Sequence, residues 1–368
     1  MTTDHRSQPR PVTLEHVARA AGVSRATVSR VINGEATVDP RLRKLVEEAI
    51  TQTRYVPNRA ARSLVTRRTD SVALVVSEQE QRDITGPFIG RIFTDPYFGR
   101  VAGGLLDVLR PRGVQVVLML ADDEASRAQL LGYLQQGHVD GVVLISSHAA
   151  DPLPGLLAGT TLPAVLAGRP QAAATASLTY VDSDQVAGAR LAADHLTSIG
   201  RRRLGTIAGP QDMPVAQERL AGFRGALEER GLREVAVAEG DFTQASGGDG
   251  IRALLARRPD LDGVFVASDL MALGAVTMLH RLGKRVPEDV AVVGFDDSSS
   301  ALASDPPLTT VRQPVEEMAA EMARLLLRQI AGGSTDDGDG ADGGDGAAPE
   351  RPSSSVLFRP ALVVRGSA

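Results

Sequence analysis

The chain has 368 residues, of which 43% are hydrophobic and 23% charged, so it is long enough for two or three globular domains. It has no cysteine, which excludes disulfides, thiol catalysis and thiolate metal sites, and its six histidines lack the spacing of metal ligands. The first residues, MTTDHRSQPRP, are polar, and no stretch approaches roughly 20 apolar residues. We therefore expect a cytoplasmic protein without a secretory signal, membrane span, metal or cofactor.

Charge is divided unevenly along the chain. Residues 1–70 contain 13 Arg and Lys against 7 Asp and Glu, a net charge of +6, whereas the whole chain carries −5. The remainder therefore carries −11. A basic N-terminal part on an acidic body predicts that the N-terminal part alone meets a polyanion.

The segment VTLEHVARAAGVSRATVSRVING (residues 12–34) predicts two short helices joined by a tight turn. Thr13 and Ser24 each precede an apolar-periodic run, where a hydroxyl side chain can cap free backbone N–H groups. Gly22 lies between the two runs, where a left-handed backbone conformation favours glycine. Such a pair of helices is typical of proteins that read the DNA major groove with the second helix.

A third helix is predicted over residues 40–53, with Asp39 as its cap and one apolar face. The basic stretch that follows, residues 55–69, contains a helix-compatible run at 58–64. Because isolated helices below about 12 residues are marginal in water, this run predicts a linker that is helical only under some conditions.

From residue 71 onward, apolar strands alternate with amphipathic helices, which predicts buried parallel sheets in two α/β lobes. The first series of strands is predicted at 71–77, 114–120, 141–146 and 163–168, and the second at 178–182, 203–209, 235–240, 263–268 and 290–297. Helices are predicted at 97–110, 185–199, 216–230, 269–282 and 314–330, and one last strand at 356–364. Residues 332–355 are acidic and glycine-rich without the spacing of an EF-hand, so we expect a flexible surface loop there.

Eight motifs in a fixed order resemble the LacI/GalR family of bacterial transcription regulators. They are the segment 12–34, YVPNRAARSL, VDSDQVAGARLAADHL, ERLAGFRGAL, ASDLMALGA, VAVVGFDD, PPLTTVRQP and LVVRGS. The resemblance implies a helix-turn-helix head, a hinge helix and a two-lobed core like the periplasmic sugar-binding proteins. It also implies three crossings of the chain between the lobes, which we place near residues 168–170, 296–300 and 312–314.

These expectations divide the chain into a DNA-binding head at 1–57, a hinge at 58–70 and an effector-binding and dimerisation core at 71–368. The first lobe is expected at about 71–169 and 313–331, and the second at about 170–312 and 356–366. No heptad tail follows the last strand, so we expect a homodimer rather than a tetramer.

The resemblance also implies which residues touch DNA. Arg25, Ala26 and Arg30 match base-contacting positions of the second helix, and arginine can bind guanine in a bidentate manner. Leu64 matches a leucine that wedges into the minor groove, although it could instead pack within the protein. Contacts to the DNA backbone are expected from Thr13, Ser24, Thr27, Asn33, Asn58, Arg59 and Arg62, and for Ser24 the capping role is an equal alternative.

An effector site is expected in the cleft between the lobes, since two lobes form a closable pocket. Side chains that suit sugar hydroxyls occur at the matching motifs: carboxylates accept hydrogen bonds, arginine donates a fork, and aromatic faces pack on C–H groups. Phe98 could equally belong to a core, Arg219 could pair with Glu218 or Asp212, and Asp296 could cap a turn. The candidate residues are Tyr97, Phe98, Arg169, Arg219, Ser268, Asp269, Asp296 and Gln313.

The chain departs from the family pattern at two positions near this site. Ser268 stands where asparagine is common and Gly168 where aspartate is common, so each removes a polar group from the expected pocket. The identity of the effector stays open, and with it whether the effector induces or corepresses.

The sequence thus predicts a sequence-specific DNA-binding regulator, a repressor of a palindromic operator controlled by a sugar. An activator, or a corepressor-dependent regulator of a non-sugar metabolite, is left open. A secreted solute-binding protein would explain only the body, and the predicted head and absent signal argue against it. An enzyme would need a nucleophile–base set, a phosphate loop or metal ligands, none of which the sequence contains.

Overall fold

The computed structural model describes residues 12–32, 34–35, 37–56, 68–77, 88–146, 148–171, 175–332 and 355–368. The chain divides into two compact units, Met1–Thr69 and Asp70–Ala368. We call them the head and the body, and each is a separate folding unit with its own core.

The head consists of three helices around a small core. They are α1 (Leu14–Ala21), α2 (Arg25–Ile32) and α3 (Pro40–Thr53). Gly22 ends α1 with φ +66°, the left-handed conformation predicted for it, and Asp39 caps α3 by accepting a hydrogen bond from Arg41 N at 2.7 Å. The core brings together Val17, Ala18, Val28, Val31, Val46, Ala49 and Tyr55. These caps and this apolar face confirm the three helices that the sequence predicts.

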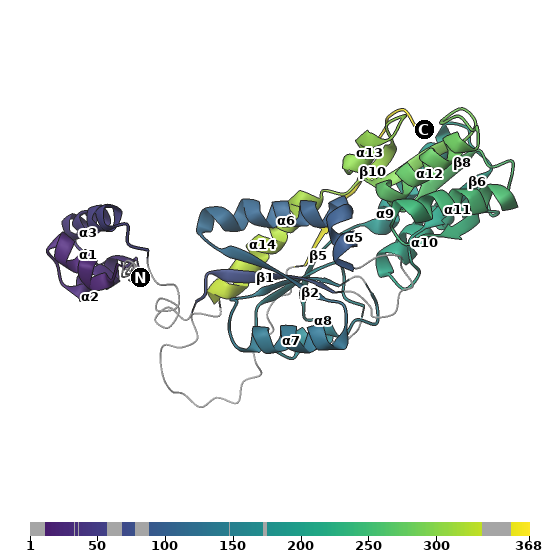
Figure 1. The fold of residues 1–368 in the computed structure, drawn as a ribbon. Coiled ribbons are helices and arrows are strands. Elements are labelled where there is room, and N and C mark those ends of the chain that lie inside the picture. Colours follow the sequence, from purple (N-terminus) through teal and green to yellow (C-terminus); the bar gives the residue numbers. More distant parts are fainter. Residues whose placement is uncertain are drawn as a thin grey trace, which may run out of the picture. The chain divides into compact units, whose positions relative to one another are not determined.

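The first lobe of the body is a parallel sheet with helices on both faces (Figure 1). The two faces follow from the alternation along the strands, because Val72, Leu74 and Val76 of β1 point to one core while Ala73 and Val75 point to another. On one face lie α6 and α14, and on the other α7 and α8. The strand order is β11 (Val356–Phe358), β5 (Thr179–Ser183), β4 (Ala164–Ala167), β3 (Val142–Ser146), β1 (Ser71–Ser77) and β2 (Gln115–Ala121).

The helices of this lobe begin at residues that cap them. Asp95 caps α6 through Tyr97 N, and Asp123 caps α7 through Ser126 N. The helices are α5 (Phe88–Thr94), α6 (Pro96–Leu109), η1 (Arg110–Arg112), α7 (Glu124–Gln135), α8 (Leu153–Ala158) and α14 (Val315–Gly332).

The second lobe repeats this architecture. Its sheet runs in the order β12 (Ala361–Val363), β10 (Thr309–Arg312), β9 (Ala291–Asp296), β8 (Gly263–Val266), β6 (Leu204–Ala208) and β7 (Ala236–Glu239). All neighbours are parallel except β12, which is antiparallel to β10. The helices α9 (Gln185–Ser198) and α10 (Pro214–Glu228) pack on one face, and α11 (Gln244–Arg257) and α12 (Asp269–Arg281) on the other; the short α13 (Ser299–Ala303) follows β9.

The predicted division between the lobes was wrong in two places. Strand β5, which we assigned to the second lobe, pairs with β4 in the first sheet. The predicted last strand is two strands, since β11 pairs with β5 in the first sheet and β12 with β10 in the second. Between them lies Pro360, which lacks the N–H that a continuous strand would need. Periodicity identifies a strand, but it does not say which sheet the strand joins.

The chain therefore crosses between the lobes at other positions than two of those predicted. It crosses after β5, between β10 and α14, and between β11 and β12. The predicted crossings near 168–170 and 296–300 were wrong. Strands β4 and β5, on either side of 168–170, both belong to the first sheet, and β9 and β10, on either side of 296–300, both belong to the second. The crossing at 312–314 lies where it was predicted.

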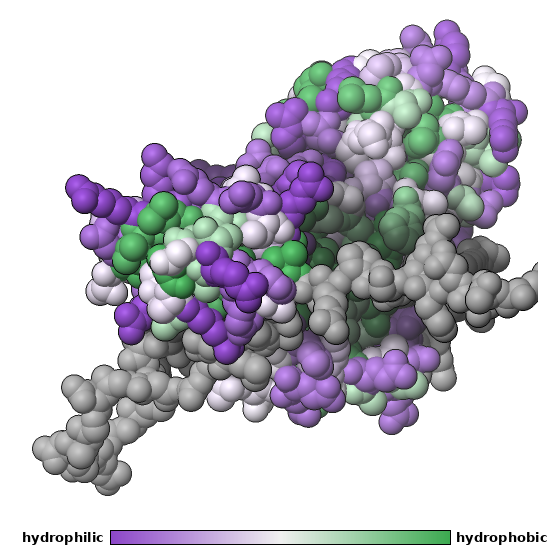
Figure 2. Space-filling model, turned by 60° about the vertical axis from the view of Figure 1, so that its left-hand side comes forward, coloured by the Kyte–Doolittle hydropathy of each residue, from purple (hydrophilic) through white to green (hydrophobic). Residues whose placement is uncertain are grey.

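The body exposes both hydrophilic and hydrophobic side chains at its surface. On the face in Figure 2, hydrophilic side chains predominate over the second lobe, with hydrophobic ones scattered between them. Within the described residues, no helix is both long and apolar enough to cross a membrane.

Candidate functional site

The head presents one polar face, formed by the start of α2. Val28 and Val31 are buried in the core, which turns Arg25, Ala26 and Arg30 outward. The side chains of Arg25 and Arg30 are 72% and 63% exposed. The predicted base-contacting residues of α2 therefore share an exposed surface.

Ser24 is the cap of α2, because its hydroxyl accepts a hydrogen bond from Thr27 N at 3.1 Å. The same hydroxyl lies 2.9 Å from Thr27 Oγ1. Thr13 is the N-cap residue of α1, as predicted, and forms a capping box with His16. The ring nitrogen His16 Nδ1 accepts from Thr13 N at 3.1 Å and lies 3.1 Å from the Thr13 hydroxyl. Thr13 and Ser24 are both exposed at the helix starts, where backbone N–H groups favour a phosphate.

Both arginines of α2 have exposed carboxylate neighbours. Arg25 lies 3.3 Å from Glu15, and Arg30 lies 3.6 Å from Glu35. Exposed pairs of this kind contribute about 0–1 kcal/mol, so either arginine can exchange its carboxylate for a stronger anion. The other candidates for DNA contact, Asn33, Asn58, Arg59, Arg62 and Leu64, lie outside the described residues.

The body contains a cavity of about 480 Å³ between its two lobes. The first lobe contributes the start of α6 and the ends of β3, β4 and β5, and the second contributes α10 and the ends of its own strands. The carboxyl ends of parallel strands are the usual place for a ligand in α/β folds. Seven of the eight predicted residues line this cavity: Tyr97, Phe98, Arg169, Arg219, Ser268, Asp296 and Gln313.

Arg219 is the centre of the polar groups in the cavity, and its side chain is 6% exposed. Its Nε donates to Gln185 Oε1 at 2.9 Å and its Nη1 to the carbonyl of Ala267 at 2.5 Å. The carboxylate of Asp296 lies 3.7 Å from Nη1, and the guanidinium lies over the ring of Phe295, 3.8 Å from its centroid. Neither Glu218 nor Asp212 is its partner among these contacts.

The network extends from Arg219 to both lobes. Gln185 Nε2 donates to Asp182 at 3.2 Å and to Gln313 Oε1 at 3.3 Å, and Gln313 Nε2 donates to Asp296 Oδ1 at 2.6 Å. Since Asp182 belongs to the first lobe and Asp296 to the second, one set of hydrogen bonds joins the two walls of the cavity. A ligand that binds these groups meets polar atoms whose positions are already fixed.

Burial changes the acidity of these groups. It lowers the pKa of Arg219, opposed by the charge of Asp296, and it raises the pKa of Asp296, opposed by Arg219 and the hydrogen bond from Gln313. Burial also raises the pKa of Asp95 to about 6. Such a partly desolvated set of charges favours a ligand that supplies hydroxyl groups rather than another net charge.

Asp182 provides a carboxylate beside Gly168, the position where the family has one. Its Oδ2 accepts from Arg169 N at 3.0 Å, directly after Gly168. The Arg169 guanidinium lies 5.8 Å from the ring centroid of Tyr180. Although residue 168 is glycine, this wall of the cavity therefore still has a carboxylate, which Asp182 supplies from the neighbouring strand β5.

Tyr97 and Phe98 line the cavity and also pack against the core of the first lobe. Their ring centroids are 5.6 Å apart in an edge-to-face arrangement. Phe98 therefore lies both at the edge of the core and in the wall of the cavity, so the two alternatives given for it do not exclude each other.

The prediction for Asp269 was wrong, because this residue does not line the cavity. It is fully buried, and its carboxylate accepts from Ser298 N at 2.7 Å and from Thr310 Oγ1 at 2.6 Å. Burial raises its pKa to about 8. Asp269 therefore joins the start of α12 to the segment after β9 and to β10, while the neighbouring Ser268 caps α12 and borders the cavity.

Several cavity residues were missed by the sequence analysis. They are Asp95, Asp182, Gln185, Glu218, Asp241 and Phe242 among others. Asp182, Asp241 and Phe242 each lie at or just after the carboxyl end of a strand, and this position was the signal that could have found them.

Two family models match the chain. Residues 13–58 match the model "Bacterial regulatory proteins, lacI family", and residues 193–368 match "Periplasmic binding protein-like domain". The first match spans the three helices of the head, and the second spans the C-terminal part of the body.

Relatives match over most of the chain. The HTH-type transcriptional regulator CelR of Thermobifida fusca is 49% identical over 88% of this chain and 93% of its own length. The ribose operon repressor of Halalkalibacterium halodurans is 34% identical over 86% of this chain and 90% of its own length.

Solved structures show the same architecture. The transcriptional regulator CelR–cellobiose complex has a TM-score of 0.71 at 44% identity and covers 97% of this chain and 100% of its own. The lac repressor dimer bound to operator and an anti-inducer has a TM-score of 0.77 at 25% identity and covers 97% and 99%. With its helix-turn-helix head and its two-lobed body, the chain belongs to the lacI family of bacterial transcriptional regulators.

Proposed function

We propose that this protein is a cytoplasmic repressor, not an enzyme, that releases a palindromic operator when a disaccharide of the cellobiose class fills the cavity between its lobes. We choose this class of sugar because the chain is similar to CelR, with 49% identity over 93% of that protein. A related CelR structure is a complex with cellobiose. The ribose operon repressor is less similar, at 34% identity.

The chemistry of the cavity supports a neutral, hydroxyl-rich ligand. Carboxylates of Asp182, Glu218 and Asp296 offer acceptors, and the guanidinium groups of Arg169 and Arg219 offer donors. Aromatic rings on both walls, among them Tyr97 and Phe242, suit the C–H faces of sugar rings. The volume of about 480 Å³ lies within the range of roughly 300–1,000 Å³ typical of small-molecule pockets.

On the DNA side, we assign base contacts to Arg25, Ala26 and Arg30 of α2. Thr13, Ser24, Thr27 and Asn33 would bind phosphates, and the basic segment with Asn58, Arg59, Arg62 and Leu64 would bind between the half-sites. A single head is small, so two heads on a symmetric dimer would supply the affinity for a palindrome.

Control by the sugar follows from the position of the cavity. A ligand shifts an equilibrium only when it binds one conformation better than the other. Groups from both lobes meet in the cavity, so a sugar that binds both walls favours one arrangement of the lobes. The start of the body at Asp70 and β1 belongs to the first lobe, so a change in that lobe can reach the connection to the head.

The experiment is a titration of the full chain with cellobiose, maltose, glucose and ribose by isothermal calorimetry. The same sugars are then added to a fluorescent operator complex, with anisotropy as the readout. We expect cellobiose to bind and to release the operator, and maltose, its α-linked isomer, to bind at least roughly tenfold more weakly. Binding of ribose without cellobiose would contradict the sugar class, and tighter operator binding with cellobiose would identify a corepressor.

A further inference from the structure

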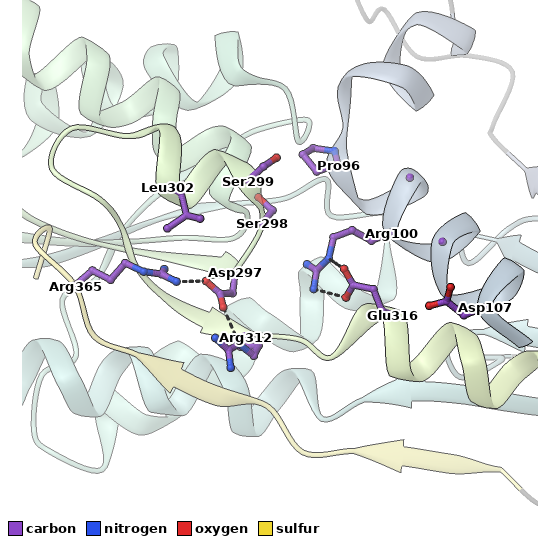
Figure 3. A pocket seen from close by; sticks show the side chains of 12 residues that line it. Pro96, Arg100, Asp107, Asp297, Ser298, Ser299, Leu302, Arg312, Glu316 and Arg365 are labelled. Atoms are coloured by element: carbon purple, nitrogen blue, oxygen red, sulfur yellow. Dashed lines mark hydrogen bonds and ion pairs between the residues drawn. The ribbon is translucent and has the colours of Figure 1, made fainter.

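A second pocket lies at the junction of the lobes and is lined by charged side chains. Its volume is about 690 Å³, and it lies between α6 of the first lobe and the segment from Asp297 to α13 of the second. Figure 3 shows two groups of ion pairs in it: Arg100 with Glu316, and Asp297 with Arg312 and Arg365. Neither Arg100 nor Glu316 lines the effector cavity.

All three guanidinium nitrogens of Arg100 donate hydrogen bonds in this pocket. Nε and Nη2 donate to the two carboxylate oxygens of Glu316 at 2.7 and 2.8 Å. Nη1 donates to the main-chain carbonyl of Asp296 at 2.8 Å, and Nη2 also donates to the carbonyl of Gln313 at 3.2 Å. The side chain is 18% exposed, so these bonds are partly shielded from water.

The two carbonyls that Arg100 binds belong to residues whose side chains line the effector cavity. Asp296 and Gln313 are joined there by the 2.6 Å hydrogen bond between Gln313 Nε2 and Asp296 Oδ1. Arg100 thus holds the backbone of this pair from a helix of the first lobe, while their side chains meet the effector on the other side.

The backbone at this point is strained. Asp296 has φ +113° and Asp297 has φ +52°, conformations that side-chain-bearing residues rarely adopt. Such a conformation persists only where the surroundings hold it. Asp297 is held by Arg312 at 2.6 Å and by Arg365 at 2.5 Å, and Asp296 by Arg100.

The sequence of α6 allows this approach. A Cβ atom at Gly104 would overlap the carbonyl oxygen of Glu316 and the side chain of Ala319, so only glycine lets α6 pack this closely on α14. Arg100 lies one turn before Gly104 on the same side of the helix and therefore faces Glu316. The hydrogen bonds from Arg100 also lower the pKa of Glu316, which keeps the pair charged.

We propose that Arg100 is a positioning residue, which holds Asp296 and Gln313 in the geometry that binds the effector and so couples effector affinity to the contact between α6 and the second lobe. This proposal rests on the proposed effector cavity, but not on the identity of the sugar. It assigns a role in ligand binding to a side chain that does not line the effector cavity but binds the main chain of two residues that do.

The test compares Arg100→Gln and Arg100→Lys with Asp107→Asn, which changes the charge of an exposed residue in the same pocket outside these four bonds. We expect Arg100→Gln to weaken cellobiose binding at least roughly tenfold, as hydrogen bonds to a charged group imply. Arg100→Lys should stay at least roughly fivefold weaker, because an ammonium lacks the planar fork. Asp107→Asn should bind like the parent. Parental affinity in either Arg100 variant would overturn the proposal.

A second readout needs no sugar. Hydrogen exchange of the peptides covering residues 294–300 and 310–317 should be faster in Arg100→Gln than in the parent and Asp107→Asn, with the rest of the body unchanged. If the parent does not bind cellobiose, the proposed sugar is wrong, and this exchange measurement alone decides the role of Arg100. Unchanged exchange in those two peptides, or faster exchange throughout the body, would overturn it.

Discussion

In the head, Arg25 and Arg30 keep 72% and 63% of their side chains exposed, whereas in the body Arg219 keeps 6% and Arg100 18%. The head arginines have one loosely placed carboxylate each, at 3.3 and 3.6 Å. The body arginines are held by several hydrogen bonds at 2.5–3.2 Å.

The difference agrees with the partners that we propose for each part. A polyanion brings its own strong charge, so exposed arginines can leave weak partners and lose little. A neutral ligand brings only hydroxyl groups, so the cavity must fix its donors and acceptors beforehand. Salt should therefore weaken the binding of DNA much more than the binding of the effector.

We expect the largest effect when the buried arginine of the body is replaced. Arg219→Met keeps an apolar stem but removes the cation beside Asp296 and the donor to Gln185 Oε1, and a buried charge that loses its counter-charge is strongly destabilising. We expect effector affinity to fall more than roughly a hundredfold by calorimetry. Arg224→Met, on an exposed position of the same helix, is the matched control. Near-parental affinity in Arg219→Met would show that the effector does not use this network.

The exposed arginines should give a smaller effect that depends on salt. We expect Arg25→Ala or Arg30→Ala to weaken operator binding by about 1–2 kcal/mol, roughly 5- to 30-fold, with less discrimination between operator variants. Lys44→Ala on α3, whose side chain is 79% exposed, is the control. Anisotropy titrations at several salt concentrations measure both quantities. An equal loss on every DNA sequence would indicate phosphate contact and contradict base reading.

For Asp95 we expect an effect on how the stability of the body depends on pH. Because burial raises its pKa from 3.8 to about 6, the folded body binds this proton more tightly than the unfolded chain. Its contribution is therefore full at low pH and is lost as the pH rises from about 4 to about 6. Asp95→Asn, which can still cap α6, should remove this fall, which is on the order of 3 kcal/mol for a pKa raised from 3.8 to about 6.

Urea denaturation of the body at a series of pH values measures this slope. Asp249→Asn changes an exposed carboxylate, 71% accessible, and should leave the slope as in the parent. The same slope in Asp95→Asn and the parent would mean that Asp95 titrates normally.

Much of the fold could be predicted from local pattern. The helix at Pro40–Thr53 and the strand at Ser71–Ser77 have the predicted bounds, because a cap or an apolar run marks each end. The sheet that β5 joins could not be predicted, since that depends on pairing with β4 rather than on the residues of β5. Strand β10 was missed for a related reason, because its sequence TTVR is short and polar while its burial comes from β9 and β12.

The site was predictable only where a motif marked it. Arg219 and Asp296 lie in such motifs and line the cavity, but Asp269, next to Ser268 in the same motif, faces inward. The positions of Phe242 and Arg100 could not be predicted from the sequence, since their contacts depend on which strand end or helix lies opposite them. Sequence distance hides such contacts, as the 196 positions between Arg100 and Asp296 illustrate.

The last 14 residues, 355–368, supply an edge strand to each of the two sheets, β11 to the first and β12 to the second. They continue into Ser367, whose hydroxyl donates to Val292 O at 2.6 Å and accepts from Thr309 N at 2.8 Å. One short segment thus contributes a strand to both sheets and joins the two lobes of the body. An insertion, cleavage or fusion within this segment would therefore perturb both lobes. Neither lobe can be altered there without affecting the other.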